Sequence, residues 1–229
     1  MLPEVLRRAR AAGVTEFECC GTGPDDWERV AEIARAEDGV SPAFGIHPWT
    51  AAFVDIDKSF SSALKKLDEI IEQIPSASVG EIGLDGARSC KNIQVEIFIK
   101  QLEIARRHKC GVTLHCVRAA GEMAAILKCR AREIPFILLH APNISPQEWA
   151  EFERLGANVS IGPGVLLPNA AKLRALTRIV PEERLFFETD SPSDASRLCA
   201  VSELGGLNAP ENIPRIAAAV EALRLPQCG

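Results

Sequence analysis

The sequence predicts an α/β fold with a parallel sheet, closed as a barrel or open, in which strands and helices alternate along the whole chain. Three observations support this prediction. Short apolar runs alternate with stretches of helical periodicity, the length of 229 residues is common for a single barrel domain, and no linker or shift in composition marks a second domain. We therefore expect one domain that spans residues 1–229 and contains seven strands.

The first half of the chain shows the alternation through its helix boundaries. Gly13 ends a first helix, and Pro24 followed by two aspartates begins a second, because proline and acids favour the first helical turn. Leu64, Leu67 and Ile71 recur at helical spacing in a third helix. The elements expected here are helices at 3–12, 24–36, 59–74 and 92–109, and strands at 14–20, 40–46 and 78–81.

The second half repeats the same order. The run from Phe136 to Leu139 is fully apolar, as expected for a parallel strand that is buried on both faces. Ser145 and Pro146 begin the next helix, since proline suits the first helical turn. The elements expected here are strands at 111–115, 135–140, 157–161 and 184–190, and helices at 118–130, 145–155, 169–178 and 211–223.

Composition limits the classes of partner. The net charge of −5 provides no global basic field, so any contact with nucleic acid has to be local. No run approaches the roughly 20 apolar residues of a membrane span, and the first residues do not form a signal peptide, so no membrane partner is expected. The eight cysteines are scattered without a Cys-x-x-Cys pair, which favours free thiols in a reducing compartment, the cytoplasm or alternatively the nucleus.

Glu81 is distinctive because it interrupts an apolar run between Gly80 and Gly83. A strand that ends in a carboxylate between glycines suits a metal or catalytic site, and an ordinary surface glutamate is the alternative interpretation. Other predicted strands also end in polar residues, which favours the functional interpretation. The polar residues at strand ends are His47, Glu81, His115, His140 and Asp190. The remaining histidine, His108, falls within a helix, and we expect it on a solvated face.

Imidazoles combined with carboxylates indicate a metal site for Zn, Mn, Fe or Mg. Such an ion acidifies water and polarises a phosphoryl or acyl oxygen, so a metal-dependent hydrolase is the natural interpretation. For each histidine alone, a buried ring satisfied by one hydrogen bond is the alternative, but their joint placement at strand ends argues against it. The sequence shows no Gly-x-Gly-x-x-Gly after the first strand, no P-loop and no Gly-x-Ser-x-Gly, so nucleotide cofactors and serine hydrolase chemistry have no support.

Several motifs follow one another along the chain. They are Gly45-Ile46-His47-Pro48-Trp49, Gly80-Glu81-Ile82-Gly83-Leu84-Asp85, Leu114-His115-Cys116, Leu139-His140-Ala141 and Glu188-Thr189-Asp190-Ser191-Pro192. With these motifs the chain resembles the TatD family of metal-dependent hydrolases over essentially its whole length. The resemblance implies a TIM-like (β/α) barrel that hydrolyses phosphodiester bonds. Members of this family are deoxyribonucleases, often exonucleases that act on single-stranded DNA.

The resemblance also implies which residues hold metal. Glu81 matches the carboxylate that bridges the metals, and His115 and His140 match the two histidine ligands of one metal. Asp190 matches an aspartate that ligates metal and handles the proton of the attacking water. Glu81 and Asp190 are therefore the expected catalytic residues, and the expected cofactor is a divalent ion, Mg, Mn or Zn.

Substrate contacts are implied at two further positions. His47 matches a site histidine that contacts the phosphate, and Arg118 stands where the family often has a basic residue. Trp49 is able to stack a base, although packing at the rim of the site is the favoured interpretation.

The sequence departs from the family pattern at the N-terminus. The family begins with a strand that ends in His-x-His and supplies ligands for a second metal, whereas this chain begins in the helix that would follow. A truncated product and a degenerate family member are both consistent with this departure. One metal site is therefore expected and the second is in question, activity is expected to be impaired, and the exposed strand edges are expected to favour self-association.

Three functions remain open on the sequence alone. The leading one is a metal-dependent hydrolase of phosphodiester bonds, a deoxyribonuclease or exonuclease with single-stranded DNA as its substrate. The alternatives are a metal-dependent hydrolase of a small-molecule ester and a truncated, non-catalytic family member.

Overall fold

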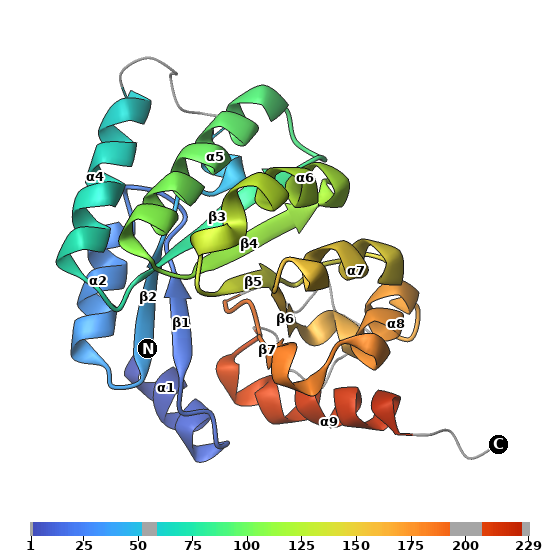
Figure 1. The fold of residues 1–229 in the computed structure, drawn as a ribbon. Coiled ribbons are helices and arrows are strands. Elements are labelled where there is room, and N and C mark those ends of the chain that lie inside the picture. The colour runs from blue at the N-terminus through green and yellow to red at the C-terminus, as the bar shows by residue number, and fades with distance from the viewer. Residues whose placement is uncertain (1, 52–58, 193–207, 226–229) are drawn as a thin grey trace. The chain divides into compact units, whose positions relative to one another are not determined.

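The computed structural model describes residues 2–51, 59–192 and 208–225, and these residues form two compact units (Figure 1). The five-strand unit comprises residues 16–140 and 150–158, and the two-strand unit comprises the described residues among 1–15, 141–149 and 159–229. None of the helices in the described ranges has the length and apolar character that crossing a bilayer requires.

Five parallel strands form the sheet of the five-strand unit and lie side by side in the order of the sequence. They are β1 (Phe17–Cys20), β2 (Val40–Phe44), β3 (Ser78–Asp85), β4 (Val112–Val117) and β5 (Ile137–His140). All five were predicted, although β1 begins three residues later than expected and β4 runs two residues further. Because the strands are parallel, their carboxyl ends share one edge of this sheet, where functional residues are expected.

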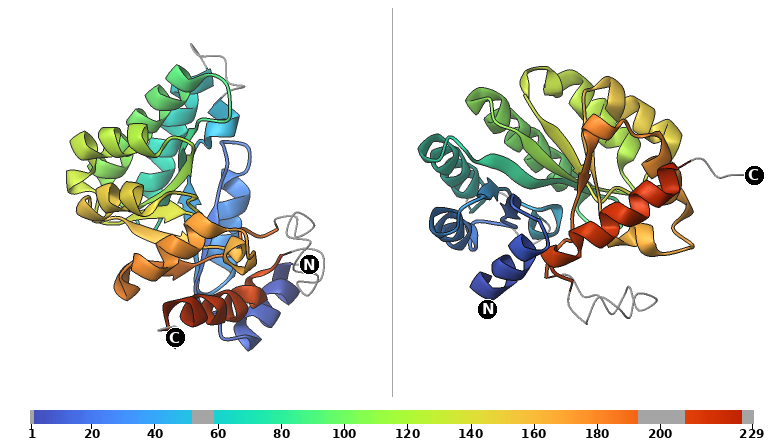
Figure 2. Two further views of the ribbon diagram at one scale, coloured as in Figure 1. Left: turned by 90° about the vertical axis from the view of Figure 1, so that its right-hand side faces the viewer. Right: turned by 90° about the horizontal axis from the view of Figure 1, so that it is seen from below.

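Helices cover the outer side of this sheet, as both views in Figure 2 show for α2, α4 and α5. The helical elements of the unit are α2 (Trp27–Ala36), α3 (Pro48–Ala51), α4 (Ser59–Gln73), α5 (Lys91–His108), α6 (Ala120–Arg130) and the 3-10 turn η1 (Ala131–Glu133). Trp27, Leu67 and Phe98 are completely buried between helices and sheet. Each such side chain stabilises the fold by about 1.5–3 kcal/mol relative to an exposed position.

Two predictions about this unit are wrong in detail. Phe136 was expected to be buried on a two-sided strand, but it precedes β5 and is 38% exposed. His108 was expected on a solvated face, but its imidazole is largely buried and its Nε2 lies 2.6 Å from Oδ1 of Asp68. In both cases, the position of the neighbouring element decides burial, and that position is not readable from local periodicity.

The two-strand unit contains β6 (Asn158–Ile161) and β7 (Leu185–Phe187), which pair in parallel. Its helical elements are α1 (Leu2–Ala11), η2 (Pro163–Leu166), α8 (Ala171–Ile179), η3 (Glu182–Arg184), η6 (Pro210–Asn212) and α9 (Ile213–Arg224), and helix α7 (Pro146–Arg154) belongs to both units. Arg224 at the end of α9 donates hydrogen bonds to the carbonyls of Thr177 (2.9 Å) and Val180 (2.7 Å). These bonds satisfy carbonyls at the end of α8 that lack helical partners.

Across the two units the described residues contain the seven predicted parallel strands. One strand end differs in a way that matters for the site. The last strand was expected to reach Asp190, but β7 ends at Phe187, so Asp190 lies on the turn that follows.

Candidate metal centre

Glu81 owes its position to an irregularity in strand β3. It lies in the middle of the strand and not at its end as predicted, because β3 continues to Asp85. The pairing with β4 shifts between Val79 and Ile82, which is the signature of a β-bulge around Glu81. A bulge turns a side chain away from the regular alternation of the strand, and it accounts for a carboxylate within an otherwise apolar run.

Gly83 keeps strands β3 and β4 close together beside this bulge. Its φ of +143° disfavours residues with a side chain, and an added Cβ would lie 2.1 Å from the carbonyl oxygen of His115. Gly83, which the sequence analysis noted beside Glu81, therefore allows close packing of the two strands next to the candidate ligands.

The register of the sheet brings two histidines to the same place. Gly83 pairs with His115, and His115 pairs with His140, so the three positions lie in one row across β3, β4 and β5. The Nδ1 atom of His115 lies 2.8 Å from Oε1 of Glu81, and the Nε2 atom of His140 lies 3.9 Å from the same oxygen. Three of the four predicted metal ligands therefore converge within the five-strand unit.

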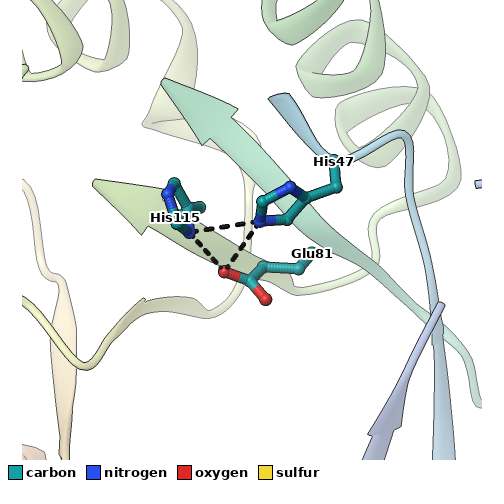
Figure 3. Close-up of side chains that lie close together, drawn as sticks. All are labelled: His47, Glu81 and His115. Atoms are coloured by element: carbon teal, nitrogen blue, oxygen red, sulfur yellow. Dashed lines mark hydrogen bonds and ion pairs between the residues drawn. The ribbon is translucent and has the colours of Figure 1, made fainter. Parts of the chain in front are cut away.

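His47 enters the same cluster from the segment after β2, as Figure 3 shows. Its Nε2 lies 3.2 Å from Nδ1 of His115 and 3.6 Å from Oε1 of Glu81. The backbone N–H of Trp49 donates to Nδ1 of His47 (3.2 Å), which in the neutral ring leaves the proton on Nε2. His47 therefore faces the cluster with an N–H donor, and the substrate contact predicted for it stays a prediction.

Gln101 on α5 secures this segment. Its side-chain oxygen accepts a hydrogen bond from the backbone N–H of Ile46 (2.7 Å), and its amide group donates to the carbonyl of Ile46 (3.1 Å). Both groups are buried, so the two bonds fix the backbone immediately before His47.

Glu81 and His115 of the cluster with His47 suit a divalent ion, whereas His47 would ligate it only after losing the proton on Nε2. Potential ligand atoms of these residues all lie within 4.8 Å of one another. Atoms that share one tetrahedral ion at about 2.0–2.2 Å lie roughly 3.3–3.6 Å apart, close to the distances found between these side chains. The set was predicted to comprise Glu81, His115, His140 and Asp190, so the presence of His47 in the compact cluster is an addition.

The charge of Glu81 also suits a cation. Burial alone would raise its pKa, but hydrogen bonds with His115 and His47 and the neighbouring imidazole of His140 outweigh burial and hold the pKa well below its usual value. Glu81 is therefore an ionised carboxylate in a site with little solvent, which is a favourable environment for a positive ion.

Asp85 at the end of β3 has a role that the sequence did not reveal. Its Oδ2 accepts a hydrogen bond from Nε1 of Trp49 (2.6 Å) and lies 3.5 Å from Nε2 of His115. Burial opposes ionisation of Asp85, but the hydrogen bonds from Trp49 and from the N–H of Ala87 lower its pKa overall. The 3.5 Å separation is not a hydrogen bond, so Asp85 borders the far nitrogen of His115 without fixing the orientation of the ring. The sequence feature that could have indicated this role is the position of Asp85 at the end of the strand.

Arg118 and the cysteines of β1 have different surroundings. Arg118 directly follows β4, is exposed, and lines a cavity of about 20 Å³ together with Asp85 and Lys91. Its predicted role in substrate binding stays a prediction. Cys19 and Cys20 are free thiols, and burial raises the pKa values of both.

The remaining predicted ligand, Asp190, belongs to the two-strand unit. There it lines a cavity of about 580 Å³ together with Asn143, Lys172 and Glu188. Glu188 accepts hydrogen bonds from the hydroxyl of Ser160 and from the backbone N–H of Ala141 (3.3 Å). The assignment of Asp190 to the metal site stays a prediction.

Comparison with known proteins bears on this geometry. A family model described as TatD related DNase matches residues 2–226. The chain is 31% identical over 216 residues to the 3′-5′ ssDNA/RNA exonuclease TatD of Cronobacter sakazakii, with 93% of this chain and 80% of that protein covered. It is 29% identical over 223 residues to the uncharacterized metal-dependent hydrolase YjjV of Escherichia coli, with 95% and 80% covered.

A solved structure extends the likeness to the fold. The crystal structure of YjjV, a TatD homologue from Escherichia coli, aligns with a TM-score of 0.84 at 27% identity and covers 98% of this chain and 85% of that chain. The predicted TIM-like barrel architecture is thereby confirmed.

Proposed function

The chain belongs to the TatD family of metal-dependent hydrolases, and from this premise we propose that it hydrolyses phosphodiester bonds in single-stranded DNA. The observation that carries the proposal is the cluster of His47, Glu81 and His115, in which a carboxylate and two imidazoles face one another at ligand distances. The relative from Cronobacter sakazakii, a 3′-5′ ssDNA/RNA exonuclease by name, supports the choice of a single strand as the substrate.

We assign the site residues two roles: some would hold the metal ion, and others would act on the phosphate or on the attacking water. Glu81, His115 and His140 would hold a divalent ion, Mg, Mn or Zn, which would supply positive charge to polarise a phosphoryl oxygen and to acidify water. The N–H of His47 faces the cluster and is proposed to donate to a phosphate oxygen. Asp190 is proposed to accept the proton of the attacking water, and an aspartate does this as a general base.

The chain meets its substrate through local positive charge. Its net charge is −5, so attraction to phosphate has to come from local cations such as Arg118 at the end of β4. Binding is expected to weaken steeply with added salt, because each neutralised phosphate releases counterions. Three further expectations stay predictions. A single unfolding transition would indicate one barrel domain, and cell fractionation would test the cytoplasmic location. Sedimentation velocity would test self-association.

The experiment is a comparison of substrates. Purified chain is stripped with chelator and resupplied with Mg²⁺, Mn²⁺ or Zn²⁺, then given single-stranded DNA, single-stranded RNA or a small phosphate ester. Release of nucleotides from DNA that requires the added ion supports the proposal. Turnover of the small ester alone favours a small-molecule hydrolase, and bound metal without turnover of any substrate indicates a non-catalytic family member.

A further inference from the structure

Trp49 differs from the other tryptophans of the chain in its exposure. Trp27 and Trp149 are 0% and 1% exposed, whereas Trp49 is 48% exposed on helix α3, which directly follows His47. A single exposed aromatic residue is unremarkable by itself. The contacts that hold this indole in place are what indicate a binding role.

The indole ring is fixed against the candidate metal centre. Its Nε1–H donates a hydrogen bond of 2.6 Å to Asp85, the carboxylate that also faces His115. The ring centroid lies 5.0 Å from that of His47 and 6.0 Å from that of His115, in edge-to-face geometry. If Trp49 only filled space at the rim of the site, its half-exposed ring would not need a buried carboxylate to orient it.

Positive charge accompanies the ring. The guanidinium carbon of Arg88 lies 4.7 Å from the centroid of Trp49, in a cation–π arrangement. Lys91 and Arg118 line a cavity at the same end of β3 and β4 as Arg88. Three cations therefore lie near the carboxyl end of β3, together with the acids Glu122 and Asp85, whose Oδ2 lies 3.9 Å from Nε of Arg88.

We propose that Trp49, with Arg88 beside it, forms a platform on which an unpaired nucleobase stacks against the indole, next to the bond that the metal centre hydrolyses. The inference rests on the proposed function and identifies the part of the substrate that the protein recognises. Every base offers a flat π-face, so an oriented indole binds single strands with little sequence preference. The guanidinium of Arg88 balances the charge of the adjoining phosphate.

The exposure of Trp49 provides a direct test. Because Trp27 and Trp149 are buried, a ligand that stacks on the protein quenches mainly the emission of Trp49. The chain is titrated with a thymidine oligonucleotide whose phosphorothioate linkages resist cleavage, and in parallel with an abasic oligonucleotide of equal length. Quenching and tighter binding by the thymidine strand alone are expected, since the two probes share their phosphates.

Variants separate stacking from charge. Trp49→Ala is expected to weaken binding of the thymidine strand by roughly tenfold and to leave binding of the abasic strand unchanged. Trp49→Phe keeps a ring and is expected to restore part of the affinity. Arg88→Gln is expected to weaken both probes equally and to flatten the salt dependence. Phe136→Ala is the matched control for loss of an exposed aromatic ring, because Phe136 directly precedes the amino end of β5, away from the carboxyl ends that carry the candidate metal centre.

The outcomes distinguish this inference from the proposed function. Equal binding of both probes by the wild-type chain, without quenching, would overturn the platform even if the chain digests DNA. Quenching by the thymidine strand together with failure to hydrolyse DNA under any ion would support the platform and overturn the function. An unchanged KM for DNA in Trp49→Ala, in protein with unchanged metal content, would also overturn the platform.

Discussion

The two units of the chain hold acidic residues in contrasting ways. In the five-strand unit, Glu81 projects from a bulged strand and is enclosed by imidazoles at 2.8–3.9 Å. In the two-strand unit, Asp190 lies on the turn after β7, where it is exposed and lines a cavity of about 580 Å³. A strand-borne cluster is suited to hold an ion, because neighbouring strands fix its geometry, whereas a turn-borne carboxylate beside a cavity is suited to meet substrate.

The largest expected effect comes from breaking the strand-borne cluster. His115→Ala and His140→Ala should each abolish binding of roughly one equivalent of metal, because a site with about three to four protein ligands does not tolerate the loss of one. Metal content is measured by mass spectrometry after dialysis without chelator. His108→Ala is the control, since this histidine pairs with Asp68 on a neighbouring helix. Unchanged metal content in both variants would show that the ligands lie elsewhere.

Asp190→Asn tests the carboxylate of the two-strand unit. If Asp190 acts on the water proton, kcat should fall by about 10²–10⁴-fold, the usual contribution of a general base. Metal retention should suffer less than in His115→Ala, because Glu81 and the histidines remain. Steady-state kinetics and metal content are measured on the same preparation. Complete loss of metal with Asp190→Asn would instead make Asp190 an equal member of the cluster.

Gly83→Ala should damage the cluster through the backbone. An added Cβ would lie 2.1 Å from the His115 carbonyl oxygen at a φ of +143°, so the strands must move apart. We expect a loss of about 1–3 kcal/mol in the free energy of unfolding, together with weaker metal binding. Urea denaturation measures the first effect. Gly121→Ala is the control, because no atom lies within 4 Å of its added Cβ and alanine favours a helix.

The smallest expected effect concerns the start of α7, in the two-strand unit. The hydroxyl of Ser145 accepts a hydrogen bond from the N–H of Glu148 (3.3 Å), and the Glu148 carboxylate accepts one from the N–H of Ser145 (2.7 Å). This pair is a capping box, so Ser145→Ala should cost about 1 kcal/mol of stability. Metal content should not change, because no predicted ligand is touched.

The capping box also predicts a pH dependence. The hydrogen bond from the backbone N–H of Ser145 lowers the pKa of Glu148 from its ordinary value of 4.5. A lowered pKa means that the carboxylate stabilises the folded chain above the ordinary value and loses this contribution as the pH falls through the folded pKa. Glu148→Gln should therefore destabilise the chain at pH 7 and have less effect in acid, as urea denaturation at both pH values would show. An equal effect at both would contradict the role of the carboxylate.

Periodicity and motif order were sufficient to predict the seven strands, most helices and the convergence of Glu81, His115 and His140. They did not reveal that Glu81 lies within β3, because a bulge depends on how two strands pair and leaves no periodic trace in one of them. They also did not reveal Asp85, whose partners Trp49 and His115 come from segments distant in the sequence.

The sequence by itself determined which polar residues lie on or near the successive strands, because the alternation of strands and helices is a local property of the chain. Only the tertiary structure decided how those residues face one another. The row of His115 and His140 follows from strand register, the donor nitrogen of His47 follows from the backbone N–H of Trp49, and the orientation of Trp49 follows from Asp85. Each of these is a contact between segments that only folding brings together, and its geometry is set by packing over long sequence distances.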